Sequence, residues 1–105
     1  MKLSRSEGRP IKDVTPEQLN EAAVGMSYGS GNFLVLEAGG DYFMQALLDD
    51  DHNFHMEYRE GSSAHHYRSV TSCTPRQMID LFLSYLARDL HWRTMIAWER
   101  HPDFR

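Results

Sequence analysis

The sequence predicts an α+β fold, in which an antiparallel sheet of a four-strand meander and a closing C-terminal strand carries two packed helices. Four extended segments follow one another between residues 32 and 70, separated by short turns of Gly and Asp. Such spacing is typical of consecutive hairpins. The motif Thr-Pro-x-Gln occurs twice, at residues 15–18 and 74–77. Each copy holds a helix-capping Thr and a Pro suited to the first turn.

The first pair of segments covers residues 32–38 and 41–48. The first is almost continuously apolar over residues 33–36, which favours a central strand. Gly39 and Gly40 lie between the two segments and supply the positive φ angles that a two-residue hairpin turn requires. We therefore expect these segments to pair as a hairpin.

The third segment, residues 53–59, alternates between two faces. Its apolar face holds Phe54, Met56 and Tyr58, and its polar face holds His55, Glu57 and Arg59. This period of two predicts a strand with one buried side. The fourth segment, residues 64–70, has fewer apolar side chains, and we place it nearer an edge.

Both predicted helices have an apolar stripe at helical spacing. The first begins at Thr15, and its stripe holds Leu19, Ala22, Ala23 and Met26. The second runs from Thr74 to about Asp89, and its stripe holds Ile79, Phe82, Leu83, Leu86 and Leu90, flanked by Met78 and Tyr85. Ser84 falls on the opposite, polar side. We expect the second helix to carry much of the core.

The chain of 105 residues predicts a single domain, residues 1–105, with flexible tails at 1–9 and 100–105. Residues 10–14 are expected to form a short edge strand or an extended lead-in. Residues 91–99 alternate through Trp92, Thr94, Ile96 and Trp98, so they favour a strand that closes the sheet over a continued helix.

Composition narrows the classes of function. The formal net charge of −4 argues against direct nucleic-acid binding, which relies on clustered Lys and Arg, and a charged partner is expected to be basic. No apolar run reaches the roughly 20 residues that span a bilayer, and no signal peptide is evident. One cysteine, Cys73, precludes an internal disulfide and suits a reducing compartment. We expect a cytoplasmic protein without membrane contact.

The residues alone indicate no enzyme chemistry. His52 with His55, and His65 with His66, are the candidate metal ligands, but both spacings place the two rings on opposite faces of a strand. We therefore expect no metal site and no cofactor. Cys73 lies just before a helix start, where a thiol pKa can fall, although a buried or loop cysteine is the simpler interpretation. No Ser or Cys lies in a nucleophile motif.

The densest charge in the sequence is the run Asp49, Asp50 and Asp51 between the second and third segments. One interpretation is a solvated turn, since Asp favours turns through its own side-chain hydrogen bonds. Another is a recognition loop for a basic protein surface. A Ca²⁺ site is a third, although the spacing does not match an EF-hand.

Several short runs resemble the Imm1-type immunity proteins of bacterial polymorphic toxin systems. These runs are residues 33–37 (FLVLE), 42–46 (YFMQA), 56–61 (MEYREG), His66-Tyr67, the helix ending in 84–86 (SYL), and Trp92-Arg93 with Trp98-Glu99. The resemblance covers residues 32–99. It implies a non-catalytic α+β domain that binds and blocks a cognate toxin, often a nuclease or a deaminase.

Combined with the charge pattern, the resemblance predicts a partner-binding surface centred on the aspartate run. The residues of this predicted surface are Asp41, Asp49, Asp50, Asp51 and Glu57. Its partner would be a toxin with a basic active-site groove. The alternative function is a small ligand-binding or enzymatic α+β domain that uses the sheet face bearing His and Tyr. A toxin-like gene next to this one would favour the first function.

Overall fold

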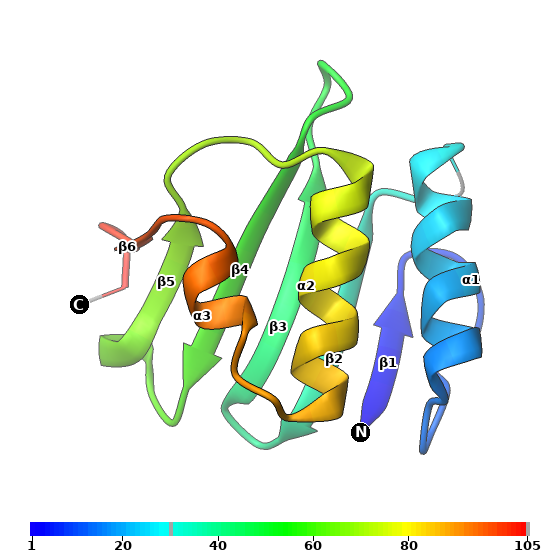
Figure 1. Ribbon diagram of the computed structural model, residues 1–105, viewed down its shortest axis with the longest axis horizontal. Coiled ribbons are helices and arrows are strands. Elements are labelled where there is room, and N and C mark those ends of the chain that lie inside the picture. The colour runs from blue at the N-terminus through cyan, green and yellow to red at the C-terminus, as the bar shows by residue number, and fades with distance from the viewer. Residues whose placement is uncertain (30, 105) are drawn as a thin grey trace.

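In the residues that the structure describes, six antiparallel strands form one sheet, and three α-helices cover one of its faces (Figure 1). The computed structural model describes residues 1–29 and 31–104. The elements, in chain order, are β1 (Lys2–Arg5), α1 (Pro16–Ser27), β2 (Phe33–Gly39), β3 (Tyr42–Leu48), β4 (Phe54–Glu60), η1 (Ser63–His65), β5 (His66–Ser69), α2 (Pro75–Ala87), α3 (Trp92–Met95) and β6 (Trp98–Arg100). The predicted α+β class and antiparallel sheet are confirmed.

The strands pair in sequence order, from β1 at one edge to β6 at the other. The predicted meander corresponds to β2 to β5, and the register follows the predicted alternation. Phe54, Met56 and Tyr58 are at most 7% exposed and face the helices. The turn of the first hairpin comes one residue later than expected, because Gly39 pairs with Tyr42 and leaves Gly40 in the turn. Both glycines have positive φ, at 144° and 51°.

Both helix starts are built as predicted. The hydroxyl of Thr15 accepts the Gln18 N–H at 3.2 Å, and the Gln18 side chain accepts the Thr15 N–H at 3.0 Å. Thr74 and Gln77 repeat this reciprocal pair in α2. Each pair satisfies backbone donors that have no partner inside the helix. Local chemistry therefore fixes where both long helices begin.

The buried stripe of α2 differs from the predicted one. Met78, Leu81 and Phe82 are fully buried, whereas Leu90 lies beyond the helix end and is 55% exposed. Phe82 is buried as predicted, but Ile79, Leu83 and Leu86, which were predicted in the same stripe, are only partly buried. Ser84, predicted on the polar side, is buried. The rotation of the helix about its axis is set by contact with α1 and the sheet, which the spacing of apolar residues does not specify.

The first residues of the chain are part of the sheet, in contrast to the predicted tail. β1 pairs with β2 from Lys2 opposite Glu37 to Arg5 opposite Leu34, and Leu3 is fully buried. Ile11 forms an isolated bridge with Leu3, which agrees with an extended segment at residues 10–14. Four residues with one apolar side chain give too short a signal for sequence reasoning, because the stability of this strand comes from β2.

The C-terminal segment also departs from the prediction of one strand over residues 91–99. Trp92–Met95 forms the short helix α3, and only Trp98–Arg100 forms strand β6. The Trp92 N–H donates to Ser84 Oγ at 2.9 Å, which ties the chain to the end of α2 and prevents an extended run. In the predicted tail at 100–105, residues 101–104 pack against the sheet. The backbone N–H of His101 donates to the His66 carbonyl at 2.9 Å. Arg105 and Ser30 lie outside the described residues.

Candidate functional site

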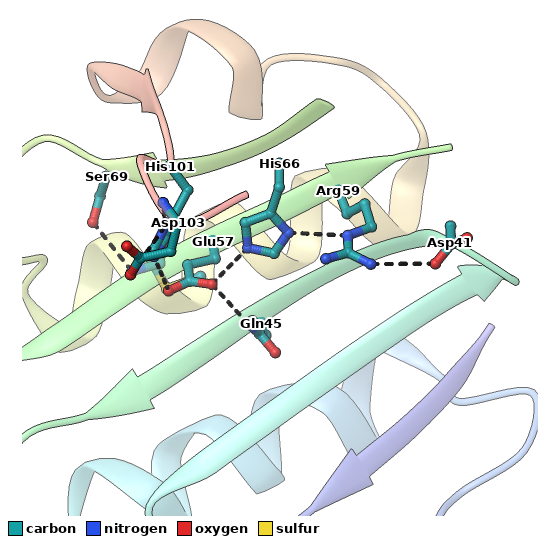
Figure 2. Close-up of polar contacts among 9 residues, drawn as sticks. Asp41, Gln45, Glu57, Arg59, His66, Ser69, His101 and Asp103 are labelled. Carbon is teal, nitrogen blue, oxygen red and sulfur yellow. Dashed lines mark hydrogen bonds and ion pairs between the residues drawn. The ribbon is translucent and has the colours of Figure 1, made fainter. Parts of the chain in front are cut away.

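A row of polar side chains lies on the sheet face opposite the helices, which we call the open face. It comprises Gln45 from β3, Glu57 and Arg59 from β4, and His66 from β5. Figure 2 shows Glu57, His66 and Arg59 side by side, with Asp41 beyond Arg59. The period of two in β4 places Glu57 and Arg59 on the same face, and His66 is the register partner of Arg59. The site is therefore positioned by strand pairing.

The hydrogen bonds of this row fix the tautomer of His66. Arg59 Nε donates to His66 Nδ1 at 3.1 Å, and His66 Nε2 lies 2.7 Å from Glu57 Oε1. Because an arginine can only donate, Nδ1 must be an acceptor and Nε2 must carry the proton. Gln45 donates a second hydrogen bond to the same Glu57 oxygen at 2.9 Å. Both ring nitrogens of His66 therefore have hydrogen-bond partners.

The segment after β6 covers this row. The Phe104 ring lies over the His66 ring with centroids 4.1 Å apart. The Arg59 guanidinium lies 5.1 Å from the same phenyl ring and 5.5 Å from the Phe43 ring. As a result the His66 side chain is only 1% exposed. This geometry suits an internal network that rigidifies the sheet, because a general base needs a nitrogen within reach of its substrate.

Glu57 keeps one oxygen for further contacts. Its Oε1 accepts the bonds from His66 and Gln45, while its Oε2 has His101 Nε2 at 3.7 Å, beyond hydrogen-bond distance. This carboxylate lines a pocket of about 340 Å³ on the open face, together with Asp49, His55, Arg68 and other residues from the end of β3, from the end of β5 and from the segment after β6. We call this the acidic pocket.

Asp49 organises the turn that borders the acidic pocket. Its Oδ1 accepts the backbone N–H groups of Asp51 and Asn53, both at 2.9 Å, and its Oδ2 lies 2.6 Å from His55 Nε2. The Asn53 N–H is the main cause of a lowered Asp49 pKa, and the His55 contact adds to it. Asp50 and Asp51 are exposed. The aspartate run is therefore a turn that Asp49 holds in place and on which Asp50 and Asp51 are exposed to solvent.

The structure brings only some of the five predicted partner-binding residues together in one place. Asp49 and Glu57 line the same pocket. Asp41 lies at the opposite end of β3, where its Oδ1 is 3.4 Å from Arg59 Nη1, so it is connected to Glu57 through Arg59 and His66 (Figure 2). Asp50 and Asp51 flank the pocket through the shared turn. The pocket therefore gathers Asp49, Asp50 and Asp51 with Glu57, which lies opposite Gln45 in the middle of β3, whereas Asp41 lies apart at the start of that strand.

Sequence reasoning missed the central role of His66. The adjacent pair His65 and His66 was predicted to be two ordinary exposed or half-buried imidazoles on opposite faces of a strand, but His65 ends the short helix η1, while His66 is buried in β5. The alternation of Glu57 and Arg59 was the available signal for a polar row. Arg59, Gln45, His101 and Phe104 join the site through tertiary contacts, which leave no local pattern.

The other candidate features of the sequence are the possible metal ligands, Cys73 and a possible membrane-spanning segment. Within residues 1–29 and 31–104, no three His, Cys, Asp or Glu side chains gather closely enough to hold a metal ion. Cys73 is buried, and burial raises the pKa of its thiol against a smaller opposing effect of a hydrogen bond with Ser69. None of the helices in the described part of the chain is long and apolar enough to cross a membrane.

Comparison of the chain with models of protein families, with curated proteins and with solved structures gave no match. The fold and the site define the class of protein as far as a two-layer α+β domain, with a hydrogen-bonded polar row and an acidic pocket on the open face.

Proposed function

We propose that this protein is an immunity-type inhibitor that binds a cognate bacterial toxin and blocks its active site. The acidic pocket carries the proposal, because two carboxylates held in place by hydrogen bonds, those of Asp49 and Glu57, line it next to the exposed Asp50 and Asp51. The resemblance of residues 32–99 to Imm1-type immunity proteins supports the same function, as does the net charge of −4.

The acidic pocket suits a basic side chain of the toxin. Glu57 Oε2 accepts no hydrogen bond among the described residues, although His101 Nε2 lies 3.7 Å from it within the same pocket, and the other oxygen, Oε1, is fixed by His66 and Gln45. An Arg or Lys that enters the pocket gains a charge-assisted hydrogen bond without first ordering the carboxylate. The exposed Asp50 and Asp51 would act at longer range, by attracting the toxin before contact.

A toxin with a cationic groove for nucleic acid, such as a nuclease or a deaminase, fits this arrangement best. In such a groove, carboxylates can occupy positions that substrate phosphates otherwise take. We place the interaction in the cytoplasm, where the single thiol of Cys73 stays reduced. In this proposal the polar row on the open face is structural support for the pocket and has no catalytic role.

The first test is co-purification with the product of the neighbouring gene, followed by stopped-flow association at low salt. We expect the double variant Asp50→Asn/Asp51→Asn to lower the association rate about tenfold and to flatten its salt dependence. A matched control is Glu17→Gln/Glu21→Gln, which removes the same charge from exposed positions on α1. If both double variants slow association equally, only net charge matters and the acidic turn is not part of the interface.

Glu57→Gln tests the pocket itself. Glutamine keeps an oxygen to accept from His66 and Gln45, so the fold should be retained, which thermal melting can verify. We expect dissociation of the complex to become at least about tenfold faster, because close charge pairs mainly set the lifetime of a complex. An unchanged dissociation rate in a folded Glu57→Gln variant would place the contact surface elsewhere and refute the role of the pocket.

A further inference from the structure

A different pocket lies at the other end of the sheet, on the helix side. Its cavity volume is about 310 Å³, at the small end of the range of about 300–1,000 Å³ for ligand pockets. The residues used in the following argument are Tyr42, Glu60, Tyr85, Arg88, Trp92 and Arg93. Tyr42 and Glu60 are register partners at the ends of β3 and β4, and the others come from the end of α2 and from α3. We call this the corner pocket.

Tyr85 presents an unused hydroxyl to the corner pocket. The residue is only 8% exposed, and its hydroxyl has no hydrogen-bond partner in the described part of the chain. No described side-chain nitrogen or oxygen is both sealed from solvent and unpaired, so the Tyr85 oxygen opens into the pocket it lines. Burial, and next the charge of Glu60, raise the Tyr85 pKa to about 12. The phenol is therefore a neutral donor at physiological pH.

The charges around the corner pocket leave a positive surplus. Glu60 Oε2 and Arg93 Nη2 are 2.7 Å apart, and this contact raises the Arg93 pKa, so the two charges compensate each other. Arg88 is exposed and has no carboxylate within 4.0 Å in the described chain. The C-terminus of α2 opposes it with a partial charge of at most about −0.5. The formal charges of Glu60, Arg93 and Arg88 sum to +1, which favours one anionic group on the Arg88 side of the Tyr85 hydroxyl, away from the charge of Glu60.

The turn that carries Arg88 is held in an unusual conformation. Arg88 and Leu90 have φ of 59° and 66°, in the left-handed region that few non-glycine residues occupy. Asp89 stabilises the turn because its carboxylate accepts from the Ser84 hydroxyl and from the His91 N–H. Backbone strain of this kind is often retained where it positions a functional group. Here it places Arg88 and Leu90 at the edge of the pocket.

We propose that the corner pocket binds an organic carboxylate attached to an aromatic or branched apolar group. The apolar group packs against the Trp92 and Tyr42 rings, while the carboxylate receives hydrogen bonds from Arg88 and from the Tyr85 hydroxyl. Tyr42 is 52% exposed and Trp92 only 3%, so the two rings provide an outer wall and a fixed inner wall. The inference does not depend on the proposed toxin.

The carboxylate can belong to a free small acid or to the C-terminal residue of a peptide. The probes are therefore indole-3-acetate with its neutral analogue indole-3-acetamide, and a tetrapeptide ending in Phe with a free carboxylate or a C-terminal amide. Binding is followed by ¹H–¹⁵N NMR titration of the intact chain. We expect saturable shifts confined to the ends of β3, β4 and α2 and to α3, with affinity at least about tenfold lower for each amide. Whichever of the two acids binds more tightly shows whether the natural carboxylate belongs to a free small acid or to a peptide C-terminus.

Variants separate the role of each group. Arg88→Gln should weaken the acid about tenfold and leave the amide nearly unchanged, whereas Tyr85→Phe removes a donor that an amide carbonyl can also use and should weaken both, with melting temperatures close to that of the parent. Arg76→Gln is the matched control, because Arg76 is also exposed on α2 but lies at its other end. The proposal is overturned if neither acid binds, if the amides bind equally well, or if Arg76→Gln weakens binding as much as Arg88→Gln.

Discussion

His66 Nε2 and Glu57 Oε1 lie 2.7 Å apart on the open face, with the imidazole 1% exposed and the glutamate side chain 12% exposed. This side-chain hydrogen bond links β5 to β4, in addition to the backbone hydrogen bonds between the two strands. Arg59 extends it toward Asp41, and Gln45 connects it to β3. The open face is thus stabilised by a connected polar network where a second layer of helices would otherwise supply apolar contacts.

Removal of Glu57 from this network should cost stability. Glu57→Leu leaves the His66 N–H and the Gln45 amide without their acceptor, and an unpaired buried group costs about 1–3 kcal/mol. We expect the free energy of unfolding to fall by about 2 kcal/mol in urea denaturation.

Glu99→Leu is the control, since Glu99 pairs with Arg68 at a site where both side chains are more than 40% exposed. Its effect should stay below about 1 kcal/mol. The double variant Glu57→Leu/His66→Phe should recover part of the loss, because both polar partners are then apolar. Equal losses for Glu57→Leu and Glu99→Leu would show that the network does not stabilise the fold.

Leu81 should be far more sensitive to truncation than Leu90. Leu81 is fully buried, whereas Leu90 is 55% exposed. Leu→Ala in a packed core removes apolar contacts and leaves a cavity, at a cost of about 2–5 kcal/mol. We expect this loss for Leu81→Ala and less than about 0.5 kcal/mol for Leu90→Ala. Chemical denaturation measures both, and a comparable loss for the two would contradict the observed rotation of α2.

Asp49 should make the stability of the protein depend on acid pH. Its pKa in the folded state lies below the ordinary 3.8, mainly because of the Asn53 N–H. The charged form is therefore favoured by folding. Its stabilising effect is complete above pH 3.8 and is lost as the pH falls through the folded-state pKa.

The measurement compares the parent with Asp49→Asn from about pH 2 to about pH 7 by thermal melting. We expect the parent to melt higher at about pH 5–7 and the difference to shrink below about pH 4. Asp50→Asn is the control and should show no such trend, because Asp50 is an exposed residue of the same turn. A difference between parent and Asp49→Asn that grows as the pH falls would mean that the carboxylate does not organise the turn.

Local chemistry in the sequence was sufficient for much of the fold. Thr15 and Thr74 fix the starts of α1 and α2 through contacts three residues away, and the alternation of residues 54–59 fixes the strand, its register and its buried face. These features depend on neighbours within a few residues. For this reason they can be read from the chain before any tertiary contact is known.

The remaining features depend on residues far apart in sequence. β1 exists because it pairs with β2, and α3 replaces a predicted strand because Ser84 binds the Trp92 N–H. The sequence indicated an ordinary strand histidine at His66, yet Glu57 and the cover of Phe104 make it a buried hydrogen-bonding centre. The sequence determined the periodic elements, whose energies are local. The tertiary structure decided which polar groups lie together, because that depends on strand pairing and burial between distant segments.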